Sequence, residues 1–178
     1  MKEILGRARY RSLQFFKAVS ATVTQEDLAL VESVLTNPAQ RELFQRMTVA
    51  DRRHAVALLR ALRAQRHTHP ALMQAALLHD VAKSGAGISV FHRVVIVLLQ
   101  ALRPGWLAWL ADDGGGPWRR PFAQYLHHPT VGAGWAEAAG CLPLAVSMIR
   151  RHQLPLSPQS GTLEDELLGH LQAADDQN

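Results

Sequence analysis

Signals for helix starts recur along this chain, whereas signals for β-strands are nearly absent, and this contrast constrains the fold more than any other feature. Three threonines are each followed, at the third position, by an aspartate, which resembles a capping box, and two prolines stand where a first helical residue belongs. These positions are Thr24, Thr48 and Thr162 for the threonines, and Pro38 and Pro70 for the prolines. We therefore expect an all-α fold.

The periodicity of apolar residues between these starts predicts the helix boundaries. The predicted helices span residues 4–20, 25–36, 38–47, 49–66, 70–83, 89–102, 105–111, 118–127, 129–139, 143–152 and 163–176. Loops are expected at 84–87, 112–117 and 154–161, where glycine, proline and serine gather.

The composition indicates a folded chain with a hydrophobic core. Of the 178 residues, 48% are apolar and 19% are charged. The one cysteine, Cys141, excludes a disulfide framework and a cysteine-based zinc site, and it fits a reducing cytoplasm. The net charge of +4 suits a phosphorylated ligand or an acidic lipid but is small for a dedicated nucleic-acid binder. Because the basic N-terminus lacks the apolar stretch of a secretory signal, we expect a cytoplasmic protein.

The stretch 88–111 is unusually apolar. Its uninterrupted apolar core is only 94–99, far short of the ~20 residues that a membrane span needs. We expect a buried helix followed by a short helix that bears Trp106 and Trp109. This segment suits a pocket wall or a dimer contact, and peripheral contact with a membrane surface is a less favoured alternative.

The dipeptide His79-Asp80 lies inside the otherwise apolar helix expected at 70–83. Burying an imidazole beside a carboxylate is unfavourable unless a partner compensates both groups, and a bound cation is a general solution. Lys83 follows one turn after His79, so its amine is expected to reach whatever His79 binds. The pair therefore predicts further metal-capable side chains on the inward faces of other helices.

Helical periodicity turns two such side chains inward. His54 shares the apolar stripe of the helix expected at 49–66, on the side away from its arginines. Asp175 lies within the apolar face of the last helix, whereas Asp176 lies roughly opposite and is expected to meet solvent.

Histidines at helix ends extend the set. His152 closes the helix expected at 143–152. A second candidate stands before the helix start at Pro129, and periodicity leaves open whether it is His127 or His128.

The resulting candidate set contains imidazoles and carboxylates but no thiolates. Its members are His54, His79, Asp80, His128, His152 and Asp175. Such ligands suit Mn, Fe, Co, Ni or Zn rather than calcium. Six ligands exceed the needs of one ion that keeps an open position, so we expect two ions bridged by Asp80.

Four of these residues, in this order, resemble the motif of the HD-domain superfamily of metal-dependent phosphohydrolases, an all-helical fold: His54, His79-Asp80 and Asp175. The segments around His128 and His152 are similar to the additional histidine motifs of its dinuclear members, a branch that includes the HD-GYP phosphodiesterases. The run His-Asp-Val-Ala-Lys at 79–83 is similar to the His-Asp-Ile-Gly-Lys form of that branch.

The resemblance covers roughly residues 48–176 and implies a role for each candidate. The ligands it implies for one metal are His54, His79, Asp80 and Asp175, and those for the second are His128 and His152, with Asp80 bridging. Because the family pattern has histidine directly before the proline, it implies His128 rather than His127. Lys83 would contact the substrate phosphate. The chain would divide into an N-terminal helical extension at 1–47, packed on the core, and an HD-domain helical bundle at 48–178 with its insertion at about 88–111.

The chain departs from the dinuclear relatives at Gln153, where they often have a second histidine. An amide oxygen can still bind a metal, though less strongly than imidazole. No Gly-Tyr-Pro follows His152, which argues against cyclic di-GMP as the substrate, and the His-Asp-x-x-Glu-Asp variant linked to guanosine alarmones is absent too.

The resemblance predicts a metal-dependent phosphohydrolase or phosphodiesterase that acts on a nucleotide or another small phosphoester through a metal-activated hydroxide. Asp80 and Lys83 would be its catalytic residues. The alternative is an HD-fold regulatory or ligand-binding module with weak turnover or none, which Gln153 favours. Specific nucleic-acid binding is not expected, and the sequence predicts neither the substrate nor the oligomeric state.

Overall fold

The computed structural model describes residues 23–86, 95–96, 99, 106, 109–110, 116, 119–156 and 161–178. Every regular element among these residues is helical, so the all-α prediction is confirmed. The elements are α2 (Gln25–Val34), α3 (Pro38–Arg46), α4 (Val49–Ala64), α5 (Pro70–Leu78), the 3-10 helix η1 (Val81–Ala86), α8 (Arg120–Ala138), α9 (Pro143–Arg151) and α10 (Leu163–Asp175). The helix expected at 4–20, and most of those expected at 89–102 and 105–111, lie outside the described residues.

The predicted helix starts are confirmed by their caps. The Thr24 hydroxyl accepts a hydrogen bond from the Asp27 backbone N–H, and the Asp27 carboxylate accepts one from the Thr24 N–H in return. Thr48 and Thr162 likewise accept from the backbone N–H three residues on, at the starts of α4 and α10. Each such cap stabilises its helix by about 1 kcal/mol, which explains why the starts follow from local sequence.

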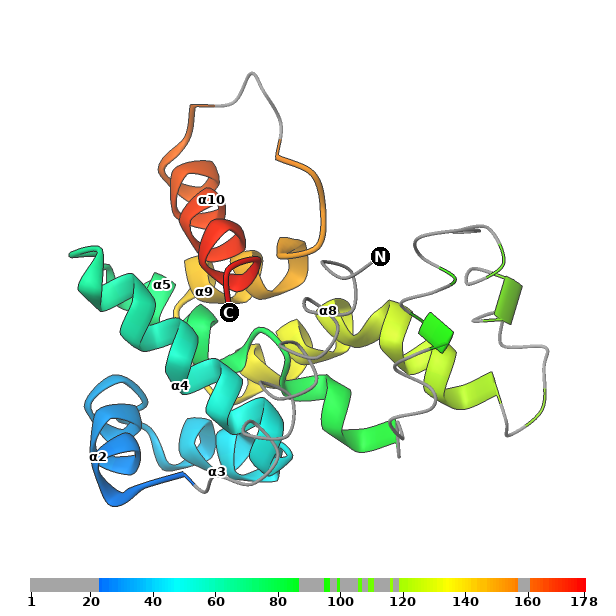
Figure 1. The fold of residues 1–178 in the computed structure, drawn as a ribbon, viewed down its shortest axis with the longest axis horizontal. Coiled ribbons are helices and arrows are strands. Elements are labelled where there is room, and N and C mark those ends of the chain that lie inside the picture. Colours follow the sequence, from blue (N-terminus) through cyan, green and yellow to red (C-terminus); the bar gives the residue numbers. More distant parts are fainter. Residues whose placement is uncertain are drawn as a thin grey trace, which may run out of the picture.

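Helix α5 lies at the centre of the core. All residues from 71 to 82 are buried, and α5 packs against α2, α3, α4, α9 and α10 (Figure 1). Apolar side chains from these helices form one continuous cluster, to which α2 and α3 contribute residues such as Val31, Leu43 and Phe44. The described part of the N-terminal region therefore shares its core with the rest of the protein.

The single helix expected at 70–83 is interrupted, and that prediction was wrong. Helix α5 ends at Leu78, and the chain resumes as η1 at Val81, so that His79 and Asp80 lie at the junction. The tighter winding of η1 brings the Lys83 backbone N–H to the Asp80 carbonyl, at 2.9 Å. The same element carries the backbone through Ala86, so residues 84–86 of the loop expected at 84–87 are helical.

The two helices expected at 118–127 and 129–139 form one continuous helix, α8, with Pro129 inside it. A proline has no N–H, so the carbonyl four residues earlier, that of Tyr125, receives no backbone donor from it. The His128 ring nitrogen Nδ1 donates to this carbonyl at 2.5 Å instead. A side-chain bond thus replaces the missing backbone bond, which is why the proline does not begin a new helix.

Little of the insertion expected at 88–111 is described. Ile96 is buried against Phe122, whereas Trp106 and Trp109 are 60% and 59% exposed. None of the described helices has both the length and the apolar character needed to cross a bilayer. The wall, dimer and membrane roles suggested for this segment stay predictions.

Candidate metal centre

The predicted ligands meet beside the C-terminal end of α5. The six ligands come from five places in the helical packing: His54 from α4, His79 and Asp80 from the α5–η1 junction, His128 from α8, His152 from the end of α9, and Asp175 from the end of α10. These elements pack directly on one another, which brings residues more than a hundred positions apart into contact.

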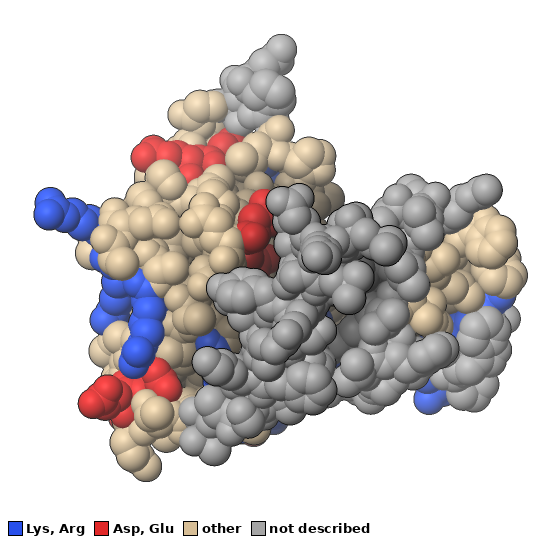
Figure 2. Space-filling view, in the orientation of Figure 1, with Lys and Arg blue, Asp and Glu red and all other residues tan. Residues whose placement is uncertain are grey.

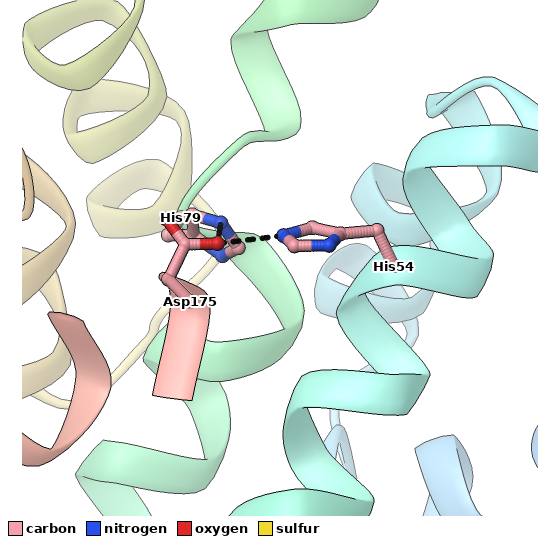
Figure 3. A group of neighbouring side chains, drawn as sticks. All are labelled: His54, His79 and Asp175. Atoms are coloured by element: carbon pink, nitrogen blue, oxygen red, sulfur yellow. Dashed lines mark hydrogen bonds and ion pairs between the residues drawn. The ribbon is translucent and has the colours of Figure 1, made fainter. Parts of the chain in front are cut away.

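A first group consists of His54, His79 and Asp175 (Figure 3). One ligand atom from each lies within 4.8 Å of the others. The Asp175 Oδ1 atom is 2.8 Å from His54 Nε2 and 3.7 Å from His79 Nε2. The side chains of His54 and Asp175 are 28% and 37% exposed, so solvent reaches this group from one side.

A second group consists of Asp80, His128 and His152, all buried. The Asp80 Oδ1 atom is 3.3 Å from His128 Nε2 and 3.6 Å from His152 Nε2. The two Nε2 atoms are themselves 3.3 Å apart. This group is therefore compact and more deeply buried than the first.

Asp80 links the two groups through its two carboxylate oxygens. While Oδ1 faces the second group, Oδ2 is 3.5 Å from His79 Nε2 and 2.6 Å from Lys83 Nζ. Sequence periodicity placed the Lys83 amine near His79, and the structure places it on the neighbouring carboxylate. One buried side chain thus contacts both groups and the only lysine among the described residues of the site.

Three of the histidines are oriented in the same way by the backbone. Each donates from Nδ1 to the carbonyl three residues earlier: His79 to Ala76 at 3.2 Å, His128 to Tyr125 at 2.5 Å and His152 to Ile149 at 2.7 Å. Two of these carbonyls lie in the last turns of α5 and α9, and the third is released by the proline in α8. A carbonyl only accepts, so Nδ1 carries the proton, and in a neutral ring Nε2 keeps a lone pair that points into the site.

The inward-facing atoms are poorly satisfied by the protein itself. His79 Nε2 and Asp80 Oδ1 are fully buried without a hydrogen-bond partner among the described residues. Each such atom is unfavourable by about 1–3 kcal/mol. A divalent cation bound to imidazole nitrogens and a carboxylate oxygen would satisfy them, so the residues present fit the metals that the sequence predicts.

The electrostatics favour the ionised carboxylates that a metal requires. Burial would raise the pKa of Asp80, but the positive charges of His79 and Lys83 hold it well below its usual range. Burial would also raise the pKa of Asp175, but its close contacts with His54 and His79 hold it below its usual range instead. Both carboxylates are therefore charged at neutral pH.

The pKa values of His128 and His79 shift in opposite directions. Burial lowers the pKa of His128, which keeps its ring neutral and able to bind a metal. Burial acts in the same direction on His79, but the neighbouring charges of Asp80 and Asp175 raise its pKa overall.

The structure distinguishes the two histidines that periodicity could not separate. His127 is exposed, whereas His128 is fully buried and joins the second group. Gln153 lies at the edge of that group, with its amide nitrogen 3.5 Å from His128 Nε2. Because a half-turn of an amide exchanges its nitrogen and oxygen, Gln153 is placed to offer the oxygen that its position in the motif suggested.

Two contacts that sequence reasoning missed hold α10 against α9. Gln172 donates to the backbone carbonyls of His152 and Leu154, at 2.9 and 2.8 Å. Near the start of α10, Arg151 pairs with Glu164 and with the neighbouring aspartate. Both pairings join segments apart in sequence, so no local pattern reveals them, yet they set where α10 delivers Asp175.

Compared with models of protein families, with curated proteins and with solved structures, the chain gives no significant match. A function is therefore inferred from the residues and their geometry.

Proposed function

We propose that this protein is a metal-dependent phosphohydrolase or phosphodiesterase of the HD-domain type, acting on a nucleotide or another small phosphoester. The arrangement of Asp80 carries the proposal, because this carboxylate faces one oxygen toward each of two groups of inward-pointing ligands. Two cations that share a carboxylate form the clamp used in many phosphoryl-transfer sites.

Each group would hold one ion. The ligands of one would be His54, His79 and Asp175, and those of the other would be Asp80, His128 and His152. Bound divalent ions would lower the pKa of water and offset negative charge on the phosphoryl oxygens. The chain would contribute the rest: backbone carbonyls keep three imidazoles oriented, and burial excludes bulk water from the second group.

Lys83 would supply a positive charge beside the substrate. Its amine is anchored to Asp80 Oδ2 and its side chain is 21% exposed, so it lies between the buried carboxylate and solvent. Such a fixed cation stabilises charge that develops on phosphate oxygens.

A regulatory or ligand-binding module without turnover is the second candidate. Gln153 favours it, because an amide beside His128 is a weaker ligand than a second imidazole. The complete set of other ligands favours the enzyme.

Elemental analysis of the purified protein, followed by hydrolysis assays of p-nitrophenyl phosphate and bis(p-nitrophenyl) phosphate with Mn or Fe, tests the proposal. We expect bound metal and hydrolysis of at least one ester in wild type. In Asp80→Asn, which keeps the shape of the side chain, we expect less bound metal and no hydrolysis. Glu166→Gln removes a charge from an exposed position on α10 and should behave as wild type.

Two outcomes contradict the proposal in different ways. A protein that binds no metal and hydrolyses neither ester is not this enzyme. Metal binding at both groups without any hydrolysis supports the module instead.

A further inference from the structure

A cleft of about 530 Å³ opens beside the proposed metal centre, at the C-terminal ends of α9 and α10. His152 and Asp175 border it, one from each group. Its other walls are Gln153, Leu154, Pro155, Gln172 and Asp176. If a substrate phosphate is bound at the two groups, this cleft is the space for the rest of the molecule.

The electrostatic character of the cleft is negative. Asp176 is exposed at its edge, and none of the described residues that line it is a lysine or an arginine. Two helices, α9 and α10, end at the cleft, and the C-terminal end of a helix carries a partial negative charge. On the face shown in Figure 2, acidic side chains lie over α10 and over α2, and basic ones lie over α4.

The cleft walls also offer hydrogen-bond acceptors and an apolar surface. The Gln172 amide nitrogen is occupied by two backbone carbonyls, which leaves its oxygen as the remaining hydrogen-bonding atom. The Asp176 carboxylate accepts and cannot donate when ionised. Leu154 and Pro155 add exposed apolar surface on the same cleft.

We infer that this cleft selects phosphoesters with a single phosphate, whose leaving group is uncharged and carries hydroxyl or amino donors, such as nucleoside monophosphates. The inference rests on the proposed function and names its substrate class. A second phosphate on the leaving group would lie against Asp176 and two helix C-termini, without a cation from the described walls. Sugar hydroxyls or base amino groups would instead donate to Asp176 and Gln172.

The test compares adenosine monophosphate and adenosine triphosphate on the full chain, loaded with Mn at a buffered free concentration. Their affinities are measured by calorimetry and their hydrolysis by phosphate release. We expect the monophosphate to bind at least about tenfold more tightly than the triphosphate, as a specificity built partly on repulsion predicts.

Variants at Asp176 locate the source of the preference. Asp176→Asn should reduce the ratio of the affinity for the monophosphate to that for the triphosphate. Asp176→Lys should abolish or invert this preference. Glu166→Gln removes the same charge from α10 outside the cleft and should leave the ratio unchanged. Circular dichroism checks that each variant is folded.

Equal or tighter binding of the triphosphate by wild type, or a ratio that Asp176→Lys leaves unaltered, would overturn the inference even in an active enzyme. Absence of bound metal would overturn the proposed function instead. Because the two affinities are measured separately from turnover, selective binding without hydrolysis supports the inference and contradicts only the enzymatic proposal.

Discussion

Replacing Pro129 by alanine should make helix α8 more regular and lower the affinity of the second group for metal. The alanine N–H can donate to the Tyr125 carbonyl, which is the acceptor that orients His128 through Nδ1 at 2.5 Å. The two donors then compete for one acceptor, and the His128 ring is no longer held with its Nε2 atom toward Asp80.

The two expected effects have opposite signs. Removing a proline from a helix interior is favourable by up to about 3 kcal/mol. Pro129 is buried, so the loss of its ring methylenes offsets roughly 1–2 kcal/mol of that gain. Stability should therefore be unchanged or slightly higher, whereas metal affinity at the second group should fall by about 10–100-fold, as for other partners that orient a metal-binding histidine.

Three measurements together check this prediction. Urea unfolding gives the stability, and competition with a chromogenic chelator gives the affinity for Mn or Zn. Long-range nitrogen–proton NMR of His128 reports the tautomer directly in metal-free protein, and we expect a mixture in the variant. Pro121→Ala, near the start of the same helix, is the matched control, because a proline there replaces no intrahelical bond. An unchanged tautomer and unchanged affinity in Pro129→Ala would show that the Tyr125 carbonyl does not orient His128.

Other changes give further tests. Asp175→Asn should lower the affinity for one metal ion by more than about 100-fold, beyond the loss typical of an orienting partner. Asp176→Asn should leave both ions bound. Equal metal content in the two variants would contradict the assignment of Asp175 as a ligand. Leu168→Ala removes a fully buried side chain and should lower the free energy of unfolding by about 2–5 kcal/mol in urea titrations. A hydrogen bond from Ser147 lowers the pKa of Glu164, so the stabilisation by this carboxylate exists above its ordinary pKa and is lost as the pH falls through its folded pKa. Glu164→Gln should therefore be less stable than wild type by up to about 1 kcal/mol at pH 7, and equal to it in strong acid.

The parts of the fold that sequence predicts are those set by neighbouring residues. Thr24, Thr48 and Thr162 start helices because a cap needs only a side chain and an N–H three residues away. Periodicity predicts neither the break at His79 nor the continuity through Pro129, which depends on the carbonyl that the His128 ring nitrogen reaches.

The residues of the candidate site likewise fall into those that the sequence predicts and those that it does not. Periodicity is enough to place His54 and Asp175 on inward faces, and the structure brings them to 2.8 Å. It cannot separate His127 from His128, because both stand near the same expected helix boundary. Periodicity gives no indication of the role of Gln172, because that role arises only when α10 packs beside the end of α9.

Backbone carbonyls orient both histidines of the second group, whereas in the first group they orient His79 but not His54. His128 and His152 are oriented by carbonyls that a proline or a helix end releases, so their lone pairs point inward whether or not a metal is bound. His54 lies in the middle of α4, where the helix itself uses the carbonyls, and its hydrogen-bond partner is the Asp175 carboxylate. Since Asp175 would also be a ligand, a metal at the first group must displace the contact that orients His54. A preorganised, buried group binds more tightly than one that has to rearrange in partial contact with solvent. We therefore expect the ion held by Asp80, His128 and His152 to be retained during purification, and the ion of the first group to exchange.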